Sequence, residues 1–163
     1  MGDGAVRTRP RRPGAGRRRR GGPPVWRRPP EVEVADAIVL RPRRPDAVPL
    51  VIGYGAIDDV SRTVLVLGVG EPAVPLGIVP DCGCDACDDG SAGILEMVDE
   101  SVLAVITGDV VHIDDGRGGE LIDTQESRSA SNWRGAGRSD EEVIAEARAG
   151  RSPFDVVRGE PWD

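Results

Sequence analysis

The sequence predicts an α+β fold, and three observations support this class. Short apolar runs rich in β-branched residues, separated by glycine and proline, indicate strands in the first half of the chain. One longer amphipathic segment and a capping-box sequence near the C-terminus indicate two helices. We therefore expect a small, mostly antiparallel sheet packed by one amphipathic helix, with a second short helix near the C-terminus.

The expected strands are apolar runs bounded by turn residues, at residues 32–40, 49–54, 60–67, 73–79, 110–113 and 120–122. The third is the clearest, because β-branched residues fill it and Gly68 follows it. Pro75 interrupts the fourth, which is therefore expected at most as an edge strand. The last two flank a turn of aspartates and glycines, a pattern typical of a hairpin.

The main helix is expected over residues 90–108, with Gly108 suited to the position after its last turn. Its expected buried face consists of residues at helical spacing: Ile94, Leu95, Val98, Val102, Val105 and Ile106. The capping box at residues 139–142 predicts a short helix that ends at Gly150. Between the elements, residues 124–138 are expected to form a flexible loop. The extended tail offers four apolar side chains for docking: Phe154, Val156, Val157 and Trp162.

Charge divides the chain into a basic arm and an acidic body. All 21 basic residues are arginine, and the formal net charge is −7. Residues 1–45 hold 13 arginines and 4 acids, a net of +9, whereas residues 46–163 hold 8 arginines and 24 acids, a net of −16. We expect residues 1–30 to be a disordered arm and residues 31–163 a single domain. Nucleic-acid binding is disfavoured, since the body is acidic and no aromatic residues alternate with the arginines of the arm.

Composition also bears on location. No apolar run reaches the roughly 20 residues that a membrane helix requires, and no signal-peptide pattern follows the arginines. The chain has three cysteines, an odd number, so it does not have a disulfide framework. We expect a cytoplasmic protein without membrane association.

The most specific chemical motif is the acidic segment Pro80-Asp81-Cys82-Gly83-Cys84-Asp85-Ala86-Cys87-Asp88. Its C-x-C-x-x-C spacing allows three thiolates to bind one zinc ion, which prefers four ligands. The fourth ligand can be His112, the single histidine, or Asp81, Asp85 or water. The alternative is structural, with small cysteines packed under a tight turn and aspartates capping the next helix. Thiol redox chemistry is a third interpretation.

Other motifs are explained without chemistry. Residues 68–73 match G-x-G-x-x-A, but Pro72 prevents the helix that a dinucleotide site requires. The paired acids lie at turns or helix starts, where carboxylates are ordinary capping groups. A serine or cysteine nucleophile would have to use His112, and no catalytic motif surrounds any serine.

Residues 80–88 resemble the signature of a family of small actinobacterial proteins, domain of unknown function 6226. In that family a P-x-C-G-C-D-A-C-D segment follows a β-rich half and precedes an amphipathic helix. Residues 157–162 also resemble the way such chains end. The resemblance covers about residues 46–163 and leaves the basic arm outside. It implies no activity, because the family has none assigned.

Three hypotheses about function follow. The first is a non-enzymatic cytoplasmic module whose cysteine segment is structural or binds one metal ion, with zinc the expected metal. The second is an acidic partner-binding protein, of the immunity or regulator kind, that uses its negative surface against a basic protein. The third, and least favoured, is a redox or hydrolytic enzyme centred on the cysteines.

Overall fold

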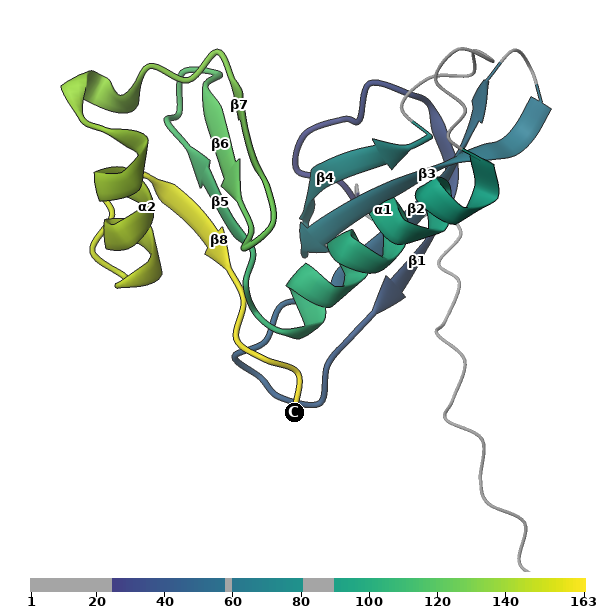
Figure 1. The fold of residues 1–163 in the computed structure, drawn as a ribbon, viewed down its shortest axis with the longest axis horizontal. Helices are drawn as coiled ribbons and strands as arrows, with labels where there is room; N and C mark the ends of the chain where they lie inside the picture. Colours follow the sequence, from purple (N-terminus) through teal and green to yellow (C-terminus); the bar gives the residue numbers. More distant parts are fainter. Residues whose placement is uncertain (1–24, 58–59, 81–89) are drawn as a thin grey trace, which may run out of the picture.

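The computed structural model describes residues 25–57, 60–80 and 90–163 (Figure 1). Its elements, in chain order, are β1 (Val34–Leu40), β2 (Leu50–Ile57), β3 (Val60–Gly70), β4 (Ala73–Val79), α1 (Gly90–Ile106), β5 (Val111–Asp114), β6 (Glu120–Asp123), β7 (Arg128–Ser131), a 3₁₀ turn (Gly135–Gly137), α2 (Asp140–Arg148) and β8 (Asp155–Arg158). The predicted α+β class is confirmed. None of the described helices is long and apolar enough to cross a membrane.

The strands form two antiparallel sheets. The first sheet has the order β1-β2-β3-β4, in which chain neighbours pair, and the second has the order β7-β6-β5-β8. Figure 1 shows the two sheets side by side, with α2 on the outer side of the second. Apolar patterning marks most of the strands but not their partners, and so the division into two sheets was not predicted.

Helix α1 packs on the first sheet. Its buried residue Val105 belongs to a cluster with Leu50, Val69, Val74 and Val110. Four further residues of the predicted face are half-buried: Ile94, Val98, Val102 and Ile106. Leu95 was wrongly assigned to this face, since its side chain is 61% exposed. A residue at the edge of the apolar face of a helix can face either the protein core or the solvent, and the contact with the sheet decides which.

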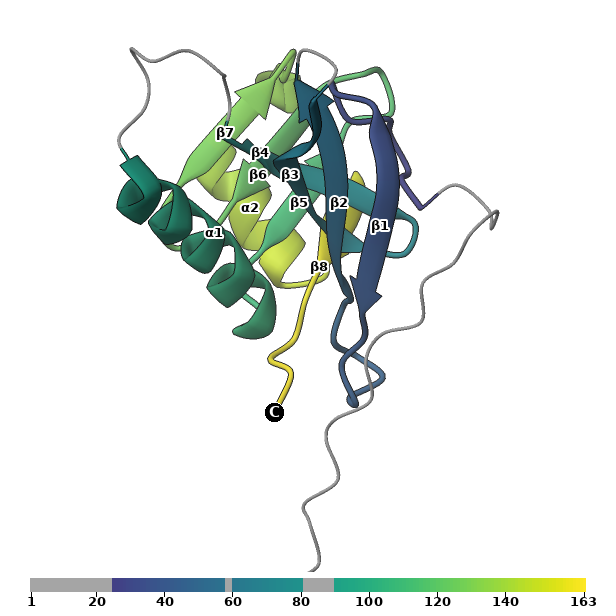
Figure 2. The ribbon, with the colours of Figure 1, turned by 90° about the vertical axis from the view of Figure 1, so that its right-hand side faces the viewer.

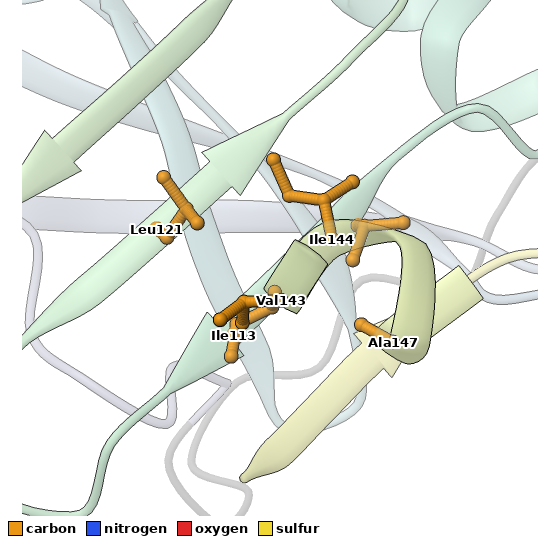
Figure 3. Close-up of a cluster of buried hydrophobic side chains, with 6 residues drawn as sticks. Ile113, Leu121, Val143, Ile144 and Ala147 are labelled. Carbon is orange, nitrogen blue, oxygen red and sulfur yellow. The ribbon is translucent and has the colours of Figure 1, made fainter. Parts of the chain in front are cut away.

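Helix α2 covers the second sheet, as Figure 3 shows. Val143, Ile144 and Ala147 of the helix are buried against Ile113 of β5 and Leu121 of β6. The predicted capping box is present: the Ser139 hydroxyl accepts from the Glu142 N–H at 3.3 Å, and the Glu142 carboxylate accepts from the Ser139 N–H at 3.2 Å. Because this helix has few turns, its packing face and its cap together define where it lies.

The chain after β6 both confirms and corrects the sequence predictions. The expectation of a flexible loop was wrong for residues 128–131, which form strand β7 and pair with β6. All four of these residues are exposed and none is strongly apolar, so the pattern of an apolar strand is missing. The tail docks as expected. Strand β8 pairs with β5, and Trp162 donates its indole N–H to the Val48 carbonyl at 3.0 Å. The backbone N–H of Trp162 donates to the Ile106 carbonyl at 2.9 Å, so the C-terminal tail ends beside the end of α1 (Figure 2).

The segment from Val25 to Arg28 lies on the folded body, although its composition placed it in the arm. Ala73 donates its N–H to the Val25 carbonyl and Arg27 donates to the Ala73 carbonyl, each at 2.7 Å. Between them, the Trp26 indole lies over glycines of β2 and β3, and a Cβ at Gly53 would be 2.9 Å from the ring. Val25–Arg28, within the expected arm, therefore contact the body, because Trp26 supplies apolar area that the glycines leave room to bury.

Candidate functional site

The predicted zinc ligands Cys82, Cys84 and Cys87 lie outside the described residues. The motif ends shortly before Gly90, the first residue of α1, in agreement with the expected order of elements. Whether the cysteines bind zinc or have a structural role stays a prediction. Within the described part of the chain, no group of three or more histidine, cysteine, aspartate or glutamate side chains is placed to hold a metal ion.

His112, the expected fourth ligand, lies in β5 and is 1% exposed. Its Nε2 is 3.2 Å from a carboxylate oxygen of Glu120, on the neighbouring strand. Its Nδ1 is buried and has no hydrogen-bond partner among the described residues. These contacts fit the tautomer in which Nε2–H donates to the carboxylate and Nδ1 carries a lone pair. The ring is thus held within the sheet by Glu120.

Glu120 connects His112 to the N-terminal segment. Its second carboxylate oxygen is 3.1 Å from the guanidinium of Arg28, which also lies 3.4 Å from Asp114. Histidine, glutamate and arginine therefore form one chain of contacts across β5, β6 and the segment before β1. This arrangement has an evident structural role, because it satisfies a buried ring nitrogen and anchors the start of the folded part.

A groove of about 360 Å³ lies between the C-terminal half of α1 and the turn that joins β6 to β7. The residues that line it come from these two places: Glu100, Ser101, Leu103, Ala104, Thr107, Asp109, Thr124, Gln125, Glu126 and Ser127. Leu103 is its largest apolar side chain and is 57% exposed. One wall of the groove is thus an exposed leucine of α1, and the other wall is the polar β6–β7 turn.

Contacts around Asp109 fix the relation between helix and turn. One carboxylate oxygen accepts from the Gln125 amide at 2.9 Å, and the other accepts from the Thr107 hydroxyl at 2.5 Å. Arg148 of α2 donates to the Asp109 carbonyl at 2.9 Å. The hydrogen bond from Gln125 therefore links the β6–β7 turn to the end of α1, and Arg148 links α2 to the same residue.

The groove is acidic. Glu100, Asp109 and Glu126 line it, and none of the described residues that line it is basic. The arginines near the turn already have acidic partners: Arg128 contacts Asp123 at 3.0 Å, and Arg148 contacts the same carboxylate at 2.9 Å. Glu100 and Glu126 have no recorded ion pair within the described part. An exposed apolar surface with unpaired carboxylates around it fits a basic, apolar ligand.

This groove was not predicted from the sequence. A signal for Leu103 was present, because it is a large apolar residue that falls outside the predicted buried face of the helix. No feature of the sequence singled out residues 124–127, since they are polar and lie in a stretch that is polar throughout. Their role depends on the approach of the β6–β7 turn to α1, which is a tertiary contact.

Comparison with known families gives one result. The model of a family described as "Family of unknown function (DUF6226)" matches residues 5–163. A search of curated proteins finds no match, and a search of solved structures finds none either. The matched range begins far before residue 46, so the estimate that the basic arm lies outside the family was wrong. With a match across nearly its whole length, the chain belongs to this family of unknown function (DUF6226).

Proposed function

We propose that this chain is a non-enzymatic binding module whose groove beside α1 receives a basic, apolar segment of a partner protein. The observation that carries the proposal is Leu103, 57% exposed in a groove lined by three carboxylates and no basic residue among its described lining. The groove gives a binding surface to the second hypothesis from the sequence, an acidic protein of the regulator or immunity kind that binds a basic partner.

The apolar part of the interaction supplies affinity. Burying the exposed half of a leucine side chain contributes on the order of 1 kcal/mol, and Ala104 and the methyl group of Thr107 extend the apolar surface. A single contact of this size is insufficient for tight binding, so a partner must also cover the neighbouring turn.

The charged part supplies selectivity. A partner arginine or lysine placed near Glu100 and Glu126 meets two carboxylates that have no recorded ion pair in the described part of the chain. The net charge of −7 favours encounter with a cationic partner and disfavours anionic surfaces. Binding through such a rim is expected to weaken as salt concentration rises.

We further propose that the segment with Cys82, Cys84 and Cys87 is structural or binds one metal ion, as a separate feature. It precedes the N-terminal end of α1, whereas the groove uses residues from Glu100 onward. Ten helical residues, about 15 Å, separate Gly90 from Glu100, so loss of the cysteines and loss of the groove are experimentally separable.

The groove is tested with a fluorescein-labelled amphipathic peptide built from arginine and leucine. Fluorescence polarisation is expected to show saturable binding, weakened about fivefold by Leu103→Ala. The matched control is Leu95→Ala, which removes an equally exposed leucine of the same helix that does not line the groove. Equal weakening by the two variants would overturn the proposal.

Charge variants make the test more specific. Glu100→Gln and Glu126→Gln are expected to slow association and to reduce the salt dependence of binding. Glu31→Gln removes the same charge from an exposed site outside the groove and serves as the control. If sedimentation equilibrium instead shows a dimer that Leu103→Ala disrupts, a second copy of the chain occupies the groove and the partner proposal is wrong.

A further inference from the structure

A second cavity, of about 560 Å³, lies at the opposite end of the second sheet from the groove. Three segments converge there. The β5–β6 turn contributes Asp115, Arg117 and Gly118, and the stretch after β7 contributes Asn132, Trp133, Arg134 and Gly135. Phe154, just before β8, completes the lining. The strand register explains the convergence, since Asp114 pairs with both Glu120 and Asp155, and Glu120 pairs with Ser131.

Two arginines in this cavity, Arg117 and Arg134, form no ion pair within the described part of the chain, although the charge of Arg117 acts on Asp115. The described part of the chain contains thirteen arginines, of which eight form ion pairs. Arg158 donates to a carbonyl instead. The other four have neither a recorded ion pair nor a side-chain hydrogen bond: Arg43, Arg117, Arg134 and Arg151. In so acidic a body, two unpaired guanidinium groups that line one cavity are an unusual feature.

The cavity also has a fixed aromatic wall. Trp133 and Phe154 meet edge to face, with ring centroids 5.2 Å apart and an interplanar angle of 70°. The Trp133 indole N–H donates to Asp140, at the start of α2, at 3.1 Å. Both rings pack against the buried cluster beneath α2. The wall is therefore positioned before any ligand arrives, which lowers the entropy cost of binding.

Asp115 is the one acid of the lining, and its carboxylate is engaged by the turn itself. One oxygen accepts from the N–H of Arg117 at 2.7 Å and from the N–H of Gly119 at 2.8 Å. These backbone hydrogen bonds, with a smaller contribution from nearby arginine charge, hold the pKa of Asp115 below its ordinary value. Asp115 therefore keeps its negative charge, and the charge balance of the lining is positive because Arg117 and Arg134 outnumber it.

We propose that this cavity binds a small aromatic anion, whose ring lies against Trp133 and Phe154 while its carboxylate or phosphate is held by Arg117 and Arg134. The guanidinium group suits both acids, because its planar set of donors matches two oxygens at once. The volume lies in the range of small-molecule sites. This site is independent of the groove, which has the opposite charge and lies at the other end of the sheet.

The probes are 1-naphthyl phosphate and 2-naphthoate, titrated into the full chain and followed by the NMR signal of the Trp133 indole N–H. Trp133→Phe identifies that signal among those of the three tryptophans. Saturable shifts are expected with at least one probe, and the tighter probe identifies the preferred acid. Inorganic phosphate and neutral 1-naphthol are expected to bind more weakly, because each lacks half of the recognised chemistry. Equal affinity for either of these would overturn the proposal.

Arginine variants locate the site. Arg117→Gln and Arg134→Gln are each expected to weaken binding about tenfold or more, the usual loss for a charge-assisted hydrogen bond. Arg151→Gln is the matched control, because it removes another unpaired arginine that does not line the cavity. A similar loss in all three variants would show general charge attraction and would contradict a specific site. Circular dichroism verifies that each variant is folded.

Discussion

At the residue scale, His112 is the predicted zinc ligand that lies within the described part of the chain. It is enclosed in the second sheet and contacts Glu120, which in turn contacts Arg28. A metal-binding histidine commonly uses one nitrogen for the metal and the other for a carboxylate, so the Glu120 contact alone does not decide its role. Its Nδ1 has no hydrogen-bond partner within residues 25–57, 60–80 and 90–163, and is the nitrogen that a metal would have to use.

A zinc site formed by Cys82, Cys84, Cys87 and His112 predicts one zinc per chain, measured by elemental analysis of protein purified without added metal. Cys84→Ser and His112→Gln are both expected to lower the zinc content strongly, since structural zinc needs four ligands. If zinc is lost in Cys84→Ser alone, His112 is not a ligand. If zinc and iron are both absent from the unaltered protein, the cysteines do not hold these metals.

Gly108 is the second informative residue. Its φ of +76° completes the end of α1, where Gly108 and Asp109 donate to the carbonyls of Val105 and Ala104. A Cβ at this position would lie 2.7 Å from backbone atoms of Glu160 and Pro161. This glycine therefore serves both the helix end and the docking of the tail.

Gly108→Ala is expected to lower the free energy of unfolding by about 2–5 kcal/mol, because left-handed strain and a backbone clash add together. Gly116→Ala is the control, since Gly116 has a φ of +70° but no atom within 4 Å of its added Cβ. It is expected to cost about 1–2 kcal/mol. Urea denaturation measures both variants, and equal losses would show that the tail does not approach Gly108 closely.

At the element scale, α2 depends on its charged side chains. A hydrogen bond to its own backbone N–H, together with Arg128, holds the pKa of Glu141 below its ordinary value. Arg138, whose guanidinium contacts the Glu146 carboxylate at 2.5 Å, lowers the pKa of Glu146 in the same way. Because the folded-state pKa values are lower than those of the unfolded chain, these groups stabilise the fold above the unfolded pKa.

We therefore expect the free energy of unfolding to fall as the pH drops below the ordinary glutamate value of 4.5 and then through the lower folded-state values. Urea denaturation at a series of pH values measures the change. Glu146→Gln is expected to make the curve shallower in this range. Glu126→Gln, which removes a carboxylate without a recorded ion pair in the described part, is expected to leave the slope less affected. Equal slopes for all three proteins would contradict the assignment.

At the scale of the whole molecule, residues 25–28 connect the two sheets. Trp26 packs on the glycines of the first sheet, whereas Arg27 pairs with Asp155 and Arg28 with Asp114 in the second. The arginines are more than a third exposed, and such pairs contribute little in water. The half-buried Trp26 ring is therefore expected to dominate the energy of this connection.

Deletion of residues 2–28 is expected to lower the free energy of unfolding by at least about 3 kcal/mol, the typical cost of losing a packed tryptophan. Deletion of residues 2–24 removes none of the contacts described for Val25–Arg28 and is the control. Differential scanning calorimetry should show a much larger fall in Tm for the longer deletion. Similar Tm values for the two proteins would mean that Trp26 does not dock.

The sequence by itself determined the local elements and the distribution of charge. The capping box of α2, the glycine after α1 and the β-branched run of β3 are encoded within a few residues, and each was read correctly. Such patterns act through neighbours along the chain, so they can be recognised before any tertiary contact is known. The docking of the apolar tail was also predictable, because apolar side chains in a polar segment need a surface to cover.

Only the tertiary structure decided how these elements combine. The division into two sheets, the strand made of Arg128–Ser131 and the exposure of Leu103 and Leu95 depend on partners far along the chain. The same holds for the two cavities, since one joins a helix to a distant turn and the other gathers Arg117, Arg134 and Phe154 from three segments. Polar turns and arginines without ion pairs show no periodic sequence pattern, and therefore their place in a cavity is evident only from the folded structure.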